Sequence, residues 1–261
     1  MSFLEYNTHK LFYESLGEGN NPIIFIHGLC GNHRVWSKNI PAFADNNRVI
    51  SIDMFGHGDS SNDISPKEAF ESLPLALAKL IEQENLQNVV LVGHSIAGNI
   101  LSSCIEQNIK NVTGYVFIDC AFNATQRVVD SRNKLADTLL GNPPDQLHPT
   151  VVNWYKTMMD MSADPKDNEL ILSALENIDK SWVLNFLKAT NIIRQVPKTN
   201  LPVLIFETNW LTKDEPERSF YKVMPQADYV HWPVMHHFSF VYEAEKFNKQ
   251  LQEFLDKYNF N

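Results

Sequence analysis

The chain has 261 residues, of which 44% are hydrophobic, and its formal net charge at neutral pH is -9. The composition suffices for a sizeable core, and the acidic balance excludes nucleic acid or an anionic membrane as the main partner, since both attract basic surfaces. Three cysteines without close spacing, no signal-peptide pattern and no apolar run near the roughly 18 residues of a membrane span predict a cytoplasmic protein without membrane insertion.

Short apolar runs alternate with segments of helical spacing along most of the chain. The predicted strands cover residues 10–17, 22–28, 48–53, 89–92, 112–119, 201–206 and 227–232. The predicted helices of this pattern cover residues 69–86, 96–108 and 243–258, and Pro74 is expected to mark a bend or a first turn. This alternation indicates an α/β fold with a mostly parallel, doubly wound sheet that helices cover on both faces.

One long segment interrupts the alternation before the strand at 201–206. It has no clear strand but shows helical patches at residues 127–140, 150–161, 168–178 and 181–192, separated by proline-containing loops. An insertion of this length in an α/β domain is more often a functional lid than a linker. We therefore expect a helical cap over residues 122–199, inserted between two late strands of a core made of residues 1–121 and 200–261.

The stretch "VVLVGHSIAG" at residues 89–98 places Ser95 between small residues at the junction of a strand and a helix. A strand, Gly-X-Ser-X-small-Gly and a helix form a nucleophile elbow, in which a sharp turn lifts the serine hydroxyl above the sheet. The helix N-terminus behind it favours negative charge. Ala97 stands where glycine is usual, and its single methyl group still meets the need for a small residue. A serine that only caps the helix is the alternative interpretation.

Two further segments resemble motifs of the α/β-hydrolase superfamily, and the resemblance covers nearly the whole chain. "FIHGLCGNHRVW" follows an early strand and resembles the oxyanion loop, and "DMFGHGDSS" at 53–61 resembles a structural loop of that fold. The resemblance implies that the backbone N–H groups of Leu29 and Ile96 form the oxyanion hole. It also implies that Asp53 and His57 brace their loop rather than act in catalysis.

The base that would accept the Ser95 proton is sought in the tail "HWPVMHHFSFVYEAEKFNKQL". The family pattern there is Gly-His-Phe, and its register with Phe238 and the helix after it assigns the catalytic position to His237. His236 then replaces the family's glycine and is the less favoured candidate, and Tyr242 replaces its glutamate.

The carboxylate that would orient this histidine has three candidates. Most relatives carry it after the strand that here covers 201–206, but no aspartate follows that strand in clean register. Asp214 comes a few residues late, and Glu207 can still belong to the strand. Some members of the superfamily carry the acid after the preceding strand, where this chain has Asp119. We favour Asp119 and keep Asp214 and Glu207 as alternatives.

The cap patches are rich in large apolar side chains, among them Trp154, Met158 and Met159, which we expect to contribute to a substrate pocket. No cluster of basic residues is placed to bind a phosphate or carboxylate. The cysteines Cys30, Cys104 and Cys120 lack metal-ligand spacing and "GLCGN" lacks the lysine of a phosphate loop, so neither a metal nor another cofactor is expected.

The resemblance and Ser95 together predict a serine hydrolase for small to medium, uncharged, fairly apolar carboxylic esters, acting through an acyl-enzyme. Its partner would be the small-molecule ester itself. Two alternatives stay open. One is another acyl transfer or a C–C bond hydrolysis on the same residues. The other is a slow-turnover receptor for a small molecule, because some proteins of this fold use the cap to signal to a partner.

Overall fold

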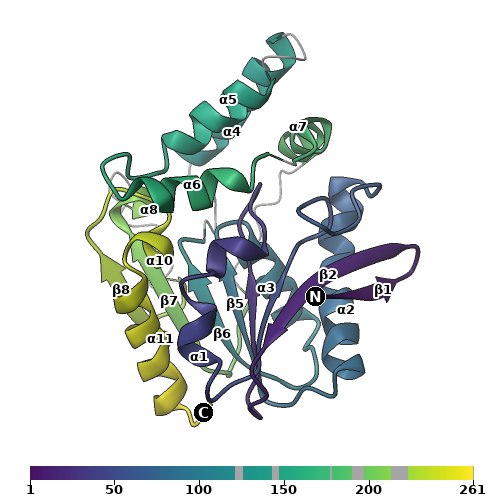
Figure 1. Ribbon diagram of the computed structural model, residues 1–261, viewed down its shortest axis with the longest axis vertical. Helices are drawn as coiled ribbons and strands as arrows, with labels where there is room; N and C mark the ends of the chain where they lie inside the picture. The colour runs from purple at the N-terminus through teal and green to yellow at the C-terminus, as the bar shows by residue number, and fades with distance from the viewer. Residues whose placement is uncertain (121–125, 143–146, 177, 190–196, 213–222, 261) are drawn as a thin grey trace.

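A computed structural model describes residues 1–120, 126–142, 147–176, 178–189, 197–212 and 223–260. Its centre is an eight-stranded sheet in the order β1-β2-β4-β3-β5-β6-β7-β8 (Figure 1). The strands are β1 (Ser2–Tyr6), β2 (His9–Leu16), β3 (Ile23–Ile26), β4 (Val49–Ile52), β5 (Val89–His94), β6 (Val112–Ile118), β7 (Val203–Thr208) and β8 (Asp228–Trp232). β1 and β2 are antiparallel to their neighbours, and all other pairings are parallel.

Strands β3, β4, β5 and β7 are buried at every position, because a parallel sheet is covered on both faces. This explains why they read in the sequence as continuous apolar runs. The sequence-based prediction missed only β1, a short edge strand in which Leu4 alone is buried. β1 joins β2 through a tight turn at Asn7, whose φ of +52° asparagine tolerates well.

The helices of the core are η1 (His33–Trp36), α1 (Ile40–Phe43), α2 (Pro66–Gln83), α3 (Ala97–Glu106), α8 (Asn209–Thr212), α10 (Ser239–Tyr242) and α11 (Ala244–Lys257). α2 and α3 pack on each other, whereas η1 contacts α10 and the Asn39 amide donates to Asn248 of α11 at 2.9 Å (Figure 1). α2 begins at Ser65, whose hydroxyl accepts the Glu68 N–H, so Pro74 lies well inside the helix and not in its first turn. The fold is thus the predicted doubly wound α/β sheet.

Among the described residues between β6 and β7, four helices lie over the end of the sheet at which its parallel strands finish (Figure 1). They are α4 (Gln126–Gly141), α5 (Leu147–Lys156), α6 (Pro165–Ser173) and α7 (Lys180–Ala189). Helix α6 begins three residues before the predicted patch at 168–178, because the Asp164 side chain accepts the Lys166 N–H and Pro165 opens the helix. Together we call these helices and their connections the cap.

The three cysteines are all buried and unpaired. Within the described part of the chain, no helix is long and apolar enough to span a bilayer.

Asp53 braces the loop after β4. Its buried carboxylate accepts the His33 N–H at 2.6 Å, the Asp59 N–H at 2.8 Å and a bond from the His33 ring at 2.9 Å. Gly58 lies against this carboxylate with a φ of +52°, and a Cβ there would stand 2.1 Å from Asp53 Oδ2.

Gly58→Ala is therefore expected to lower the free energy of unfolding by about 2–3 kcal/mol, through a strained backbone and a displaced buried carboxylate. Urea unfolding measures this loss. Gly141→Ala is the matched control, because a Cβ at Gly141 meets no heavy atom within 4 Å. An equal effect of the two substitutions would show that Asp53 can move at no cost.

Candidate functional site

Ser95 stands in the turn between β5 and α3 with a φ of +56°, a conformation that L-residues rarely adopt. Its N–H donates to the Ile118 carbonyl at 2.8 Å, and its carbonyl accepts the Gly98 N–H at 3.1 Å. Gly93 must be small, since a Cβ there would lie 2.9 Å from Leu101 and 3.1 Å from Ala97. The small residues around Ser95 therefore let α3 pack close behind a strained turn.

The loop after β3 comes very close to this turn. A Cβ on Gly28 would lie 2.8 Å from His94 Nδ1 and 3.2 Å from Ser95 Cβ, so only glycine fits there. No hydrogen bond within the described part of the chain uses the N–H of Leu29 or of Ile96. Neither of these two backbone donors is therefore used within the described residues.

His237 and Asp119 are in direct contact below the cap. The Nδ1 atom of His237 lies 3.1 Å from Asp119 Oδ2, and both side chains are almost completely buried. The carboxylate also accepts the Thr208 N–H at 2.7 Å and the Thr208 hydroxyl at 2.6 Å. A carboxylate on Nδ1 selects the tautomer that carries its proton there, which leaves the Nε2 lone pair of His237 available as a base.

Burial shifts the acid–base properties of this pair in opposite directions. Loss of water around His237 lowers the pKa of its imidazole, and nearby His236 lowers it further. Burial raises the pKa of Asp119, and the two Thr208 hydrogen bonds oppose that rise by stabilising the carboxylate. An uncharged imidazole at neutral pH follows, which is the form able to accept a proton.

The alternatives from the sequence occupy different places. The His236 ring lies edge-on to Tyr242 at 4.8 Å, and its Nδ1 has no hydrogen-bond partner within the described residues. Glu207 sits at the end of β7, where its carboxylate accepts the Tyr229 hydroxyl at 2.8 Å. Asp214 lies outside the described residues.

A small cavity of about 30 Å³ lies between the cap and the core, and both Ser95 and His237 line it. Its lining comprises Gly28, Leu29, His94, Ser95, Trp154, Tyr155, Met158, His237 and Phe238. Within the described residues, no hydrogen bond joins Ser95 to His237, although both face this space. Hydrogen bonds of catalytic groups are often long before substrate binds, so the missing bond does not separate the two residues, which line the same cavity. Met159 is buried but is not part of this lining.

Two residues of the site, Thr208 and Trp210, were not singled out from the sequence, and Tyr155 was expected only as one of the large apolar side chains of the cap. Thr208 binds Asp119, Trp210 places its ring 4.3 Å from that of His237, and Tyr155 donates its hydroxyl to the Leu29 carbonyl. The available signal for Thr208 was a hydroxyl residue two positions after the apolar run at 201–206. The contacts of Trp210 and Tyr155 depend on the positions of the loop after β7 and of the cap.

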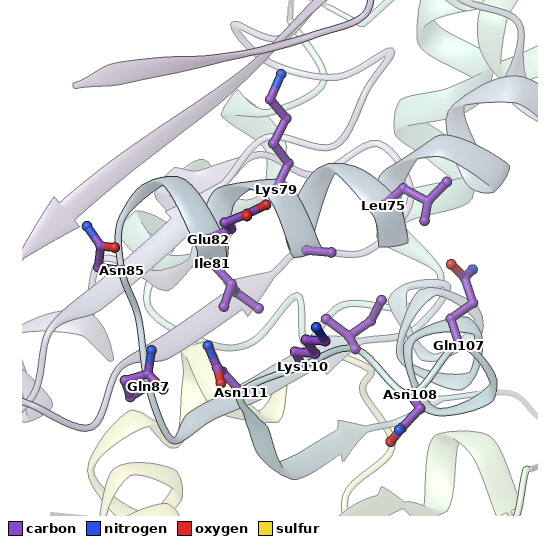
Figure 2. A pocket seen from close by; sticks show the side chains of 12 residues that line it. Leu75, Lys79, Ile81, Glu82, Asn85, Gln87, Gln107, Asn108, Lys110 and Asn111 are labelled. Carbon is purple, nitrogen blue, oxygen red and sulfur yellow. The ribbon is translucent and has the colours of Figure 1, made fainter.

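Other candidate sites lack this chemistry. Among the described residues, the one group with metal-ligand geometry is His33, Asp53 and Asp59, and hydrogen bonds within the loop already use the Asp53 oxygens. A larger groove of about 780 Å³ lies between α2 and the loop after α3 (Figure 2). Amides, Lys79, Glu82 and Lys110 dominate its polar lining, which contains no serine or histidine.

Comparison with known proteins agrees with this architecture. A non-heme chloroperoxidase, CPO-A1 of Kitasatospora aureofaciens, is 24% identical over 277 residues, covering 95% of this chain and 96% of that protein. The acetyltransferase component of the Pseudomonas putida acetoin cleaving system is 34% identical over 89 residues, 34% of this chain and 24% of that protein. This match thus spans about a quarter of that relative's length.

Solved structures share the fold at low identity. An esterase from Exiguobacterium antarcticum superposes with a TM-score of 0.82 at 16% identity, covering 98% of this chain and 99% of that one. The family model described as "alpha/beta hydrolase fold" matches residues 21–200, more than half of the chain. With the doubly wound sheet and the strained turn at Ser95, this match assigns the chain to the alpha/beta hydrolase fold family.

Proposed function

We propose that this protein is a serine hydrolase that cleaves carboxylic esters through an acyl-enzyme. The observation that carries the proposal is a single one. Ser95, on a strained strand-to-helix turn, opens into the same cavity as His237, whose other nitrogen contacts the buried Asp119 carboxylate. Nucleophile, base and orienting acid in this relation are the parts that acyl transfer needs.

The proposed reaction follows from these positions. His237 Nε2 takes the Ser95 proton as the hydroxyl oxygen attacks the ester carbonyl carbon, and the N–H groups of Leu29 and Ile96 stabilise the oxyanion that forms. The intermediate collapses when His237 returns the proton to the departing alcohol, which leaves an acyl group on Ser95. Water then attacks this acyl group by the same route, releases the carboxylic acid and restores the serine.

The cavity lining supports a small, uncharged acyl group. Trp154, Tyr155, Met158 and Phe238 make it largely apolar, and it includes no lysine or arginine that would bind an anionic substrate. A space of about 30 Å³ holds roughly one water molecule. Any ester must therefore displace cap side chains as it enters, which gives the proposed cap (residues 122–199) a role in selecting substrates. The esterase from Exiguobacterium antarcticum shares the fold, so its named activity is compatible with the proposal.

Ser95→Ala is expected to abolish hydrolysis of p-nitrophenyl acetate or butyrate, leaving only a residue of oxyanion stabilisation. Wild-type protein should react with a fluorophosphonate probe, with the label on the tryptic peptide that contains Ser95. Ser102→Ala is the matched control, because the Ser102 hydroxyl is buried in α3, the helix that follows Ser95, and donates to the Gly98 carbonyl at 2.9 Å. Unchanged turnover in Ser95→Ala would exclude the proposal, and tight binding of an ester without turnover would favour the receptor alternative.

His237→Ala is expected to cost about as much activity as Ser95→Ala, since the members of such a unit act together. His236→Ala should lose far less, because its ring packs on Tyr242 and not on Asp119. Initial rates with a saturating chromogenic ester rank the two variants. The reverse ranking would assign the base to His236.

Asp119→Asn is expected to lower kcat by roughly a thousand- to ten-thousandfold, because an amide nitrogen facing Nδ1 favours the wrong imidazole tautomer. Thr208 can still donate to the remaining carbonyl oxygen. Glu207→Gln keeps an acceptor for Tyr229 and should remain active. Melting temperatures of both variants exclude unfolding as the cause. Asp214→Asn completes the series, and loss of activity in that variant alone would move the acid to the loop after β7.

A further inference from the structure

The peptide unit between Leu29 and Cys30 is held at both of its polar ends. The Tyr155 hydroxyl donates to the Leu29 carbonyl, and the Cys30 N–H donates to His57 Nε2 at 3.0 Å. The same loop closes on itself through a bond from the Gly31 N–H to the Gly28 carbonyl at 3.0 Å. Cys30 adopts a φ of +59°, so the chain is strained where it is held.

The two groups that hold this peptide come from different parts of the molecule. His57 belongs to the loop after β4, and its Nδ1 lies 3.2 Å from the Phe55 carbonyl, which fixes Nε2 as the acceptor. Burial lowers the pKa of His57 to about 3, so the ring stays uncharged and keeps this acceptor at neutral pH. Tyr155 belongs to α5 of the cap, is 3% exposed and reaches down onto the loop.

The proposed function assigns the Leu29 N–H to the oxyanion. This N–H belongs to the preceding peptide unit, which meets the held one at the Leu29 Cα. The Leu29 N–H lies on one side of that Cα and the held carbonyl on the other, so fixing the carbonyl restricts the direction of the N–H. Glycines at 28 and 31 flank the segment and supply little restraint of their own. The peptide plane that carries the Leu29 N–H is held at its Gly28 carbonyl, which accepts the Gly31 N–H at 3.0 Å and lies 2.7 Å from His27 Nδ1. The hydrogen bonds to Tyr155 and His57 add a restraint on the next plane, across the Leu29 Cα.

The cap segment that carries Tyr155 also holds the backbone of the base. The His237 N–H donates to the Met158 carbonyl at 2.8 Å, three residues beyond Tyr155. The C-terminal part of α5 and the turn that follows it thus contact both the loop with the oxyanion donor and the residue that carries the imidazole.

We infer that Tyr155 is a positioning residue that aligns the Leu29 N–H with the oxyanion when the cap is seated on the core. The inference rests on the proposed function. Entry of an ester that lifts α5 breaks the contact with the Leu29 carbonyl, and reseating of the cap around the substrate restores it. Substrates that let α5 reseat would be turned over fastest, because the oxyanion donor is aligned only then.

Tyr155→Phe keeps the ring and removes only the hydroxyl. We expect kcat for a p-nitrophenyl ester to fall about tenfold while KM changes less than about twofold, since the lost contact acts on the transition state. Affinity for an aryl trifluoromethyl ketone, whose adduct with Ser95 carries an oxyanion, should fall by the same factor. An unchanged melting temperature shows that the variant is folded.

Tyr242→Phe is the matched control, because its hydroxyl also joins core to cap, through Asn168 Oδ1 at 2.6 Å, but lies away from the oxyanion loop. It should leave kcat and ketone affinity at the wild-type values. Wild-type kcat in Tyr155→Phe, or a change in KM alone, would overturn the inference and leave the proposed function standing. Equal turnover by Ser95→Ala and wild-type protein would instead remove the proposed function itself.

Discussion

The left-handed backbone at Ser95 is the constraint on which the rest of the site depends. A φ of +56° at a serine costs of the order of 1–2 kcal/mol, and the surrounding packing must hold it. Helix α3 can approach closely enough only because Gly93 has no side chain, and the oxyanion loop can approach only because Gly28 has none. The strained turn at Ser95 therefore needs small residues around it, because larger side chains would collide with α3 or with the loop after β3.

A second strained position lies at the residue that contacts His237. Asp119 has a φ of +46° at the end of β6, and its N–H donates to the Phe206 carbonyl of β7 at 2.8 Å. On the neighbouring strand β7, Thr208 donates both its N–H and its hydroxyl to the Asp119 carboxylate. Adjacent strand ends therefore share the task of holding the acid. The Trp210 ring lies 4.3 Å from the His237 ring on the β7 side of this pair.

The sequence predicts well what local patterns decide. Buried parallel strands and the small residues around Ser95 leave signals within a few positions. The succession of strands and helices along the chain and the turn at Ser95 could therefore be predicted. The acid was ambiguous because β6 and β7 are neighbours: Ile118 pairs with Phe206, which brings Asp119 and Glu207 to the same edge. The contact between Tyr155 and the oxyanion loop joins residues 126 positions apart, and no local pattern encodes it.

Burial of the cysteines has a consequence for oxidative chemistry. Desolvation raises the pKa of all three thiols, so they stay protonated, and their side chains are closed to peroxide and disulfide reagents. Cys30 lies in the loop after β3 and Cys120 directly follows Asp119, yet neither is exposed to an oxidant in the folded state. Oxidation falls first on the exposed methionines Met1, Met161 and Met235, whose side chains are 91%, 55% and 53% exposed. Met161 lies just beyond the cap segment that contacts His237, so sulfoxide formation there would alter the cap before it altered the chemistry beneath it.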